Sequence, residues 1–187
     1  MKYLNVLAGA ALLFLAACGG LPDRYAVVPP AVTDRITIAF RSVEIREVSL
    51  PAYAAADEIA VLNADGTLVT QDGPLWADSP ERAVALELVR NLSQLSGARV
   101  ASDPWPFEAF PDARVDVRFE TFVADARGAF RVAGQYFVAV EDGRRERSGF
   151  FDLSVPFDPE GGLAAIAGAR GQAVLDVAEV LASEGLR

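Results

Sequence analysis

The sequence predicts an α+β domain: a mixed, largely antiparallel sheet with two helices packed on one face. One observation is a run of three alternating segments, 115–123, 129–140 and 151–157, separated by short turns. The other is a pair of helical patterns, 76–97 and 163–183, on either side of this run. Alternation with a period of two is typical of half-buried strands, whereas apolar residues three and four apart are typical of amphipathic helices. Strands and helices in this order favour the α+β class.

The first strands are expected to be short. Ile36, Ile38 and Phe40 alternate with smaller or polar residues, which predicts a strand over 36–41. The apolar run 25–28 is a candidate for an edge strand.

A hairpin and a return strand are expected next. The runs 58–63 and 67–71 are joined through Asp65-Gly66, a pair that tolerates positive φ and is typical of hairpin turns. After the first helix, the segment 99–102 is expected to return as a further strand.

The first helix has start and stop signals. Asp78 or Ser79 can cap it, and Pro80 suits its first turn. Asp78 and Glu81 have the spacing of a capping box. Gly97 is a natural stop. The apolar stripe of this helix is Val84, Leu88, Leu92 and Leu95, and the polar residues expected off the stripe are Glu87, Arg90, Asn91 and Gln94.

Two further stripes are expected to face the core. The last helix carries one that Arg170 interrupts. Its members are Leu163, Ile166, Val174, Val177 and Leu181. The first long strand carries the other, formed by Val115, Val117, Phe119, Thr121 and Val123.

The N-terminus has the pattern of a secretory signal. Lys2 supplies a positive flank, and Leu4 to Ala17 is an uncharged, mostly apolar run. The run is shorter than the about 20 apolar residues of a membrane span. Leu15-Ala16-Ala17-Cys18 resembles the box at which bacterial lipoproteins are cleaved and acylated, with palmitate among the usual acyl groups. We therefore expect a signal peptide over 1–17 and lipid attachment at Cys18, with an ordinary secretory signal as the alternative.

Composition narrows the function of the mature chain. Cleavage leaves sixteen arginines against twenty-six carboxylates, a formal charge of −10, which disfavours binding to nucleic acid. No histidine is present, which excludes His-based catalysis. Cys18 is the only cysteine, and once acylated it would leave no thiol for a disulfide, a metal or a nucleophile. We expect no enzyme activity, no cofactor and no metal. The carboxylates that could still support chemistry, but that lie beside turn residues, are Asp57, Glu58, Glu141, Asp142, Asp158 and Glu160.

The chain divides into three parts. After the signal peptide, 18–35 is rich in glycine and proline and is expected to be a lipidated tether. The remainder, 36–187, has the length of one domain that can bury a core without disulfides.

Four aromatic residues allow two interpretations. Trp76, Trp105, Phe107 and Phe110 would form a partner-binding patch if they were exposed together. Alternatively, both tryptophans seal the ends of the sheet against the first helix. The loop around Pro104 to Phe110 combines prolines and large aromatics, so Trp105, Phe107 and Phe110 are the candidate docking residues.

Several segments resemble one family, the ABC-type transport auxiliary lipoproteins, which include PqiC (YmbA). Leu50-Pro51-Ala52-Tyr53 is similar to its Leu-Pro-x-Tyr segment, and Trp76-Ala77 is similar to its helix start. The stretch 100–105 is similar to its strand ending in Pro-Trp. The stretch 115–120 is similar to its Val-x-Val-x-Arg-Phe-Glu strand.

The resemblance implies an accessory subunit of an intermembrane lipid transport system. Its partners would be an MCE-domain protein and an ABC permease and ATPase, with self-association into a homo-oligomer left open. Gly19 after the lipidated cysteine resembles the pattern for sorting to the outer membrane, where the domain would face the periplasm. Two alternatives remain: a lipoprotein that assembles or plugs an outer-membrane barrel, and a lone lipid-binding lipoprotein.

Overall fold

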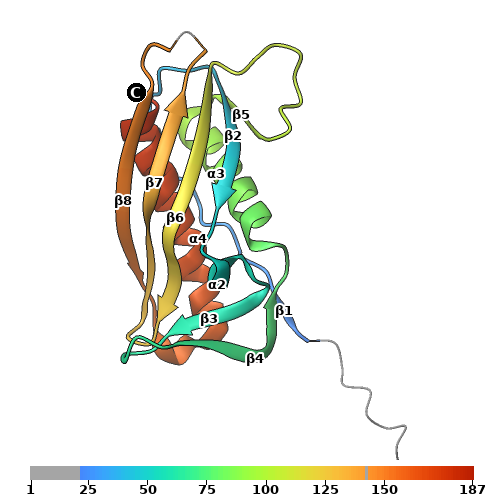
Figure 1. Cartoon of the computed structure of the whole chain (residues 1–187), viewed down its shortest axis with the longest axis vertical. Coiled ribbons are helices and arrows are strands. Elements are labelled where there is room, and N and C mark those ends of the chain that lie inside the picture. The colour runs from blue at the N-terminus through green and yellow to red at the C-terminus, as the bar shows by residue number, and fades with distance from the viewer. Residues whose placement is uncertain (1–21, 142) are drawn as a thin grey trace, which may run out of the picture.

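The computed structural model describes residues 22–141 and 143–187, and the predicted α+β class is confirmed (Figure 1). The elements, in chain order, are β1 (Arg24–Tyr25), β2 (Ser42–Ser49), α2 (Ala52–Ala55), β3 (Glu58–Leu62), β4 (Leu68–Trp76), α3 (Pro80–Ser96), β5 (Arg99–Ser102), β6 (Ala113–Asp125), β7 (Ala129–Ala139), β8 (Arg147–Pro156) and α4 (Gly162–Val180). A 3₁₀ turn (Pro159–Gly161) precedes α4, and a π-helical turn (Leu181–Gly185) follows it.

The strand β6 organises the sheet. Along one edge it pairs antiparallel with β7, which pairs antiparallel with β8. Its other edge is divided between two parallel neighbours: β2 pairs with the first half of β6, and β3 pairs only with its last two residues. Beyond β2 lies β5, whereas β4 and then β1 follow β3. The eight described strands therefore form one forked, mixed sheet.

A side chain fills the gap between the two branches. The hydroxyl of Tyr53, from the short helix α2, accepts a hydrogen bond from the backbone N–H of Phe122 at 3.2 Å. Just before α2, the backbone N–H of Leu50 donates to the Glu81 side chain at 3.2 Å. The Leu50–Tyr53 segment thus joins β2, β6 and the first turn of α3.

A β-bulge changes which face of β6 is buried. The pairing with β7 shifts register between Phe119 and Thr121. Alternation restarts one residue later, so Phe122 and Ala124 join Phe119 in the core cluster. Val123 is also buried, at 3% exposure, but it lies on the other face of the strand, and Thr121 is partly exposed. The expectation that Thr121 and Val123 share the core face of Val115 was therefore wrong.

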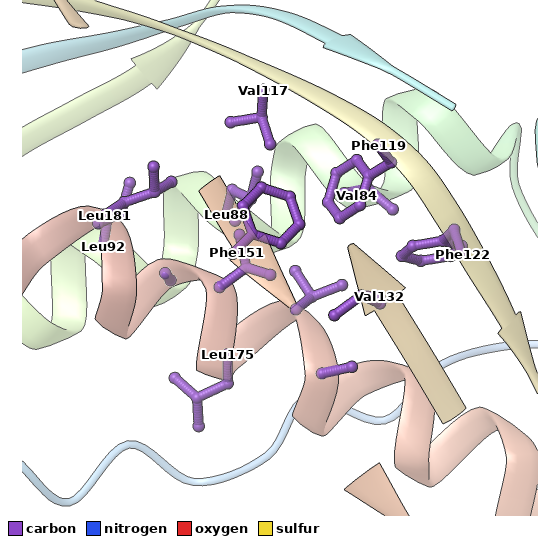
Figure 2. Close-up of a cluster of buried hydrophobic side chains, with 14 of the residues drawn as sticks. Val84, Leu88, Leu92, Val117, Phe119, Phe122, Val132, Phe151, Leu175 and Leu181 are labelled. Carbon is purple, nitrogen blue, oxygen red and sulfur yellow. The ribbon is translucent and has the colours of Figure 1, made fainter. Parts of the chain in front are cut away.

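The two long helices cover the inner face of the sheet, and the core lies between the layers (Figure 2). The predicted stripe of α3 is confirmed, since all four of its residues are fully buried. Full burial of one such side chain contributes about 1.5–3 kcal/mol. The core residues drawn in Figure 2 come from both helices and from β6, β7 and β8; among them are Leu88, Phe119, Val132, Phe151 and Leu175.

Two expectations at the edges of elements were wrong. Residues 36–41 are not a strand; they run extended, and backbone N–H groups of Ile36 and Ala39 bond to Leu95 and Leu186 instead of a ladder. The capping box of α3 does not form, because Ser79 is the N-cap without a side-chain bond and Glu81 bonds to Leu50. Gly97 ends α3 in the left-handed conformation as expected.

The described part of the N-terminal segment lies along the helical layer. The candidate edge strand is present as β1, which pairs parallel with the end of β4. Val27 then contacts α4 at Gly171, where an added Cβ would lie only 2.8 Å from the valine side chain. In Figure 1 the chain enters near β1 at one end of the long axis, whereas the loop between β5 and β6 projects at the other.

Candidate functional site

The most prominent surface feature is the loop 103–112 between β5 and β6, called here the aromatic loop (Figure 1). The indole N–H of Trp105 donates to the backbone carbonyl of Ala109 at 2.7 Å and closes the loop. The Trp105 ring meets Phe107 edge to face, with centroids 4.9 Å apart. This arrangement is a favourable one for aromatic pairs. The loop is therefore held by its own side chains.

Two rings of the aromatic loop face solvent. Phe107 is 42% exposed and Phe110 is 71% exposed. Arginines from adjacent strands flank them: the guanidinium of Arg99 lies 4.8 Å from the Phe107 centroid, and that of Arg114 lies 5.8 Å from the Phe110 centroid. Aromatic residues and arginine are the types enriched at protein interfaces.

A carboxylate fixes the base of the loop. Asp112 accepts hydrogen bonds from the backbone N–H groups of Arg41 and Ser42, at 2.8 and 3.0 Å. The Ser42 hydroxyl accepts in turn from the backbone N–H of Asp112 at 3.0 Å. Partial burial opposes ionisation, but these hydrogen bonds outweigh it and hold the pKa of Asp112 below its ordinary value. The loop is thereby tied to the start of β2.

Hollows flank the exposed ring of Phe110 on several sides. One, of about 410 Å³, lies between Trp105, Phe107 and the outer face of the sheet at Glu44. Another, of about 500 Å³, lies toward Gly97, which follows α3, and Arg99 at the start of β5. The loop thus stands clear of the domain and offers a ridge of rings with basic residues at its foot.

Trp76 does not belong to this group. It ends β4 and is only 9% exposed, in the core beneath the helices. Trp105 is partly exposed in the aromatic loop. The four aromatic residues therefore do not form one patch. Trp76 packs in the core at the end of its strand, whereas the other three lie together on the loop.

A second cluster lies inside the molecule, and the sequence analysis missed it. Arg170 of α4 is buried and donates to Glu87 of α3 at 2.9 Å. Its guanidinium lies 5.0 Å from the Trp76 ring centroid and 5.6 Å from that of Phe122. Burial raises the pKa of Glu87, although Arg170 and Arg90 oppose this effect.

The expectation that Glu87 and Asn91 lie off the apolar stripe of α3 was wrong, since both are buried. The sequence spacing did indicate their burial. Glu87 and Asn91 follow Val84 and precede Leu95 at three- and four-residue intervals, which places all four on one helix face.

The other candidate residues are scattered. Asp57 forms an exposed ion pair with Arg24 at 3.7 Å, and Asp158 accepts from the backbone N–H of Glu160 in a turn. Within 22–141 and 143–187, no group of His, Cys, Asp and Glu is placed to hold a metal ion. Cys18 and Asp142 lie outside the described residues.

No helix in the described part of the chain has both the length and the apolar character needed to cross a bilayer. The described residues have an α+β fold, and its most prominent exposed feature is the aromatic loop. The chain belongs to the ABC-type transport auxiliary lipoprotein component family, whose model matches residues 25–182. A comparison with curated protein sequences finds no match.

Solved structures share the fold at low sequence identity. A crystal structure of an uncharacterized protein has a TM-score of 0.69 at 20% identity, covering 87% of this chain and 97% of its own. A DUF330 protein from Xanthomonas campestris has a TM-score of 0.62 at 19% identity, covering 84% and 92%. A PelC dodecamer from Paraburkholderia phytofirmans reaches 0.45 at 11% identity, covering 82% and 96%.

Proposed function

We propose that the chain is a lipid-anchored, periplasm-facing accessory subunit of an MCE/ABC-type intermembrane lipid transport system, and that it acts without catalysis by docking onto a partner. Membership of the transport auxiliary lipoprotein family supports the general role. The observation that carries the docking step is the aromatic loop, where Phe107 and Phe110 are exposed beside Arg99 and Arg114. Exposed rings with adjacent arginines are suited to become anchors at a protein interface.

The docking experiment replaces Phe107 and Phe110 together by serine in the full-length chain. The measurement is co-purification with an MCE-domain protein from the same cells. We expect recovery to fall at least about tenfold, because truncation of one anchor residue costs about 2 kcal/mol or more. The matched control is Phe150→Ser, which removes a ring that is 75% exposed on β8 and should leave recovery unchanged.

The outcomes separate the proposal from its alternatives. Full recovery of the MCE protein with the double variant would place docking elsewhere on the domain. Stable recovery of an outer-membrane β-barrel protein, without any MCE protein, would favour an assembly lipoprotein.

The membrane anchor is tested separately. We propose acylation at Cys18 and location at the inner leaflet of the outer membrane, on the basis of the Leu15-Ala16-Ala17-Cys18 box and Gly19. Cys18→Ser should move the mature chain from the membrane fraction to the soluble fraction. Separation of the two membranes on a density gradient then tests the outer-membrane assignment, and wild-type protein in the inner-membrane fraction would contradict it.

A further inference from the structure

A pocket beside β1 is lined by charged side chains of the two long helices. Its volume is about 210 Å³, and it lies between β1, the end of β4, the first half of α3 and Arg170 of α4. At roughly 30 Å³ per water molecule, it holds about seven waters or a head group with a short run of methylenes. Its apolar wall is formed by Tyr25, Val27, Trp76 and Leu86.

The polar side of the pocket carries unpartnered groups. The Nε atoms of Arg90 and Arg170 are buried and make no hydrogen bond within the protein, and neither does Oε2 of Glu87. The Arg170 side chain is only 2% exposed and that of Glu87 only 10%. A buried donor without an acceptor costs about 1–3 kcal/mol, so an oxygen ligand at this place would be stabilising.

The balance of charge favours an anion. Two guanidinium groups, Arg90 and Arg170, and two carboxyl groups, Asp78 and Glu87, line the pocket. Asp78 is already paired with Arg82 of α3, and burial raises the pKa of the Glu87 carboxyl. When Glu87 is protonated, its carboxyl group can donate to an anionic oxygen. Ligand sites commonly combine an apolar wall with a few convergent polar groups.

We propose that this pocket binds the anionic head and the first methylenes of a single-chain amphiphile, with carboxylate or phosphate oxygens accepting from Arg90 and Arg170 and the chain lying against Trp76 and Leu86. The membrane itself would be the source of such an amphiphile. Tyr25 lies seven positions after Cys18, a span of at most about 25 Å, so a lipidated Cys18 would keep the pocket near the bilayer. The site is separate from the aromatic loop, and its test needs no docking partner.

Binding is measured through Trp76. The chain has two tryptophans, so Trp105→Phe leaves Trp76 as the only indole reporter. This variant is prepared as the chain from residue 18 onward with Cys18→Ser, which contains every described residue. The amphiphilic probes are octanoate and octyl phosphate, both used below their micelle concentrations. Octanol and inorganic phosphate are the comparison probes. Octanoate and octyl phosphate should change the emission saturably, with octanol and inorganic phosphate at least tenfold weaker.

Two variants locate the site. Arg90→Gln removes one guanidinium from a half-buried position and should weaken octanoate binding at least tenfold. Ala83→Phe fills the pocket wall and should abolish binding. The matched control is Arg118→Gln, which removes a half-exposed guanidinium of β6 that does not line the pocket and should leave the affinity unchanged.

Three results would overturn the proposal. The first is no saturable response to either octyl anion, which would mean that water alone occupies the pocket. The second is equal affinity for octanol and octanoate, which would remove the anion requirement. The third is equal affinity for inorganic phosphate and octyl phosphate, which would make this a free-anion site.

Discussion

The molecule uses the same pairing, arginine beside an aromatic ring, in two opposite surroundings. Inside, Arg170 lies by Trp76 and Phe122 and donates a hydrogen bond to Glu87 at 2.9 Å. Outside, on the aromatic loop, Arg99 lies by a Phe107 ring that is exposed to solvent. The chemistry of the pair therefore does not decide its role; burial does.

The two surroundings differ in the free energy needed to remove water from the guanidinium group. A buried guanidinium needs hydrogen-bond acceptors in place of water, so its loss of hydration is recovered only while the side chain at position 87 supplies an oxygen. The exposed pairs keep their hydration and contribute little to stability, about 0.5–1 kcal/mol each. The interior cluster should thus control folding, and the aromatic loop should be free to serve binding.

The largest expected effect comes from removing the buried guanidinium. Arg170→Met leaves Glu87 in the core without its partner and should lower the free energy of unfolding by about 3–5 kcal/mol, measured by urea denaturation. Arg99→Met is the matched control on the aromatic loop, where we expect less than about 1 kcal/mol. Equal losses in the two variants would remove the distinction between the clusters.

The base of the loop should have an intermediate effect. Asp112→Asn weakens the bonds to Arg41 and Ser42 and should cost about 1 kcal/mol at pH 7, at the lower end for a charged acceptor because the site is partly exposed. The pKa of Asp112 is lowered by folding from an ordinary value of 3.8. Its contribution is therefore present above that value and is lost as the pH falls through the folded pKa. A variant deficit that stays constant down to pH 2 would contradict this linkage.

Ionisation of Glu87 should change the free energy of unfolding in the opposite direction to that of Asp112. Its pKa is raised by folding from an ordinary value of 4.5, so stability decreases as the pH rises from 4.5 through the folded pKa. Glu87→Gln still offers an oxygen to Arg170 and should cost less than about 1 kcal/mol at pH 7, well below the loss for Arg170→Met. Unfolding curves at several pH values test this, and the variant should lack the decrease seen in the wild type.

The smallest effect on stability belongs to the exposed rings. Phe107→Ser with Phe110→Ser should lower the free energy of unfolding by only about 0.5 kcal/mol per ring, because each substitution removes one solvent-exposed cation–π contact. Thermal unfolding provides the measurement. A loss of several kcal/mol would show that these rings support the core, and it would reverse the comparison between the two clusters.

Regular patterns in the sequence sufficed to predict most of the fold. The turn residues and the two-residue alternation predicted the meander of β6, β7 and β8, and Gly97 marked the end of α3 correctly. Alternation alone misled at 36–41, because an extended segment packed on helices buries every second residue without needing a ladder. The bulge after Phe119 was equally invisible, since it depends on the pairing with β7.

The buried Arg170–Glu87 pair shows a different limit of prediction from sequence. Arg170 was interpreted as an interruption of an apolar stripe, because sequence periodicity classifies a charged residue as a surface residue. Its burial depends on Glu87, 83 positions earlier, being brought opposite it by the packing of α3 on α4. The aromatic loop could be predicted as a candidate because its composition is local, although the separation of Trp76 from it could not.

The path of the N-terminal segment sets a direction for the whole molecule. The chain enters beside β1, and the aromatic loop projects from the other end of the long axis (Figure 1). If Cys18 is held in a bilayer, the domain acts as a spacer: one end remains at the lipid surface while the rings are carried outward into the aqueous compartment. A partner would then be met at a height above the membrane that is fixed by the length of β6 and its neighbours.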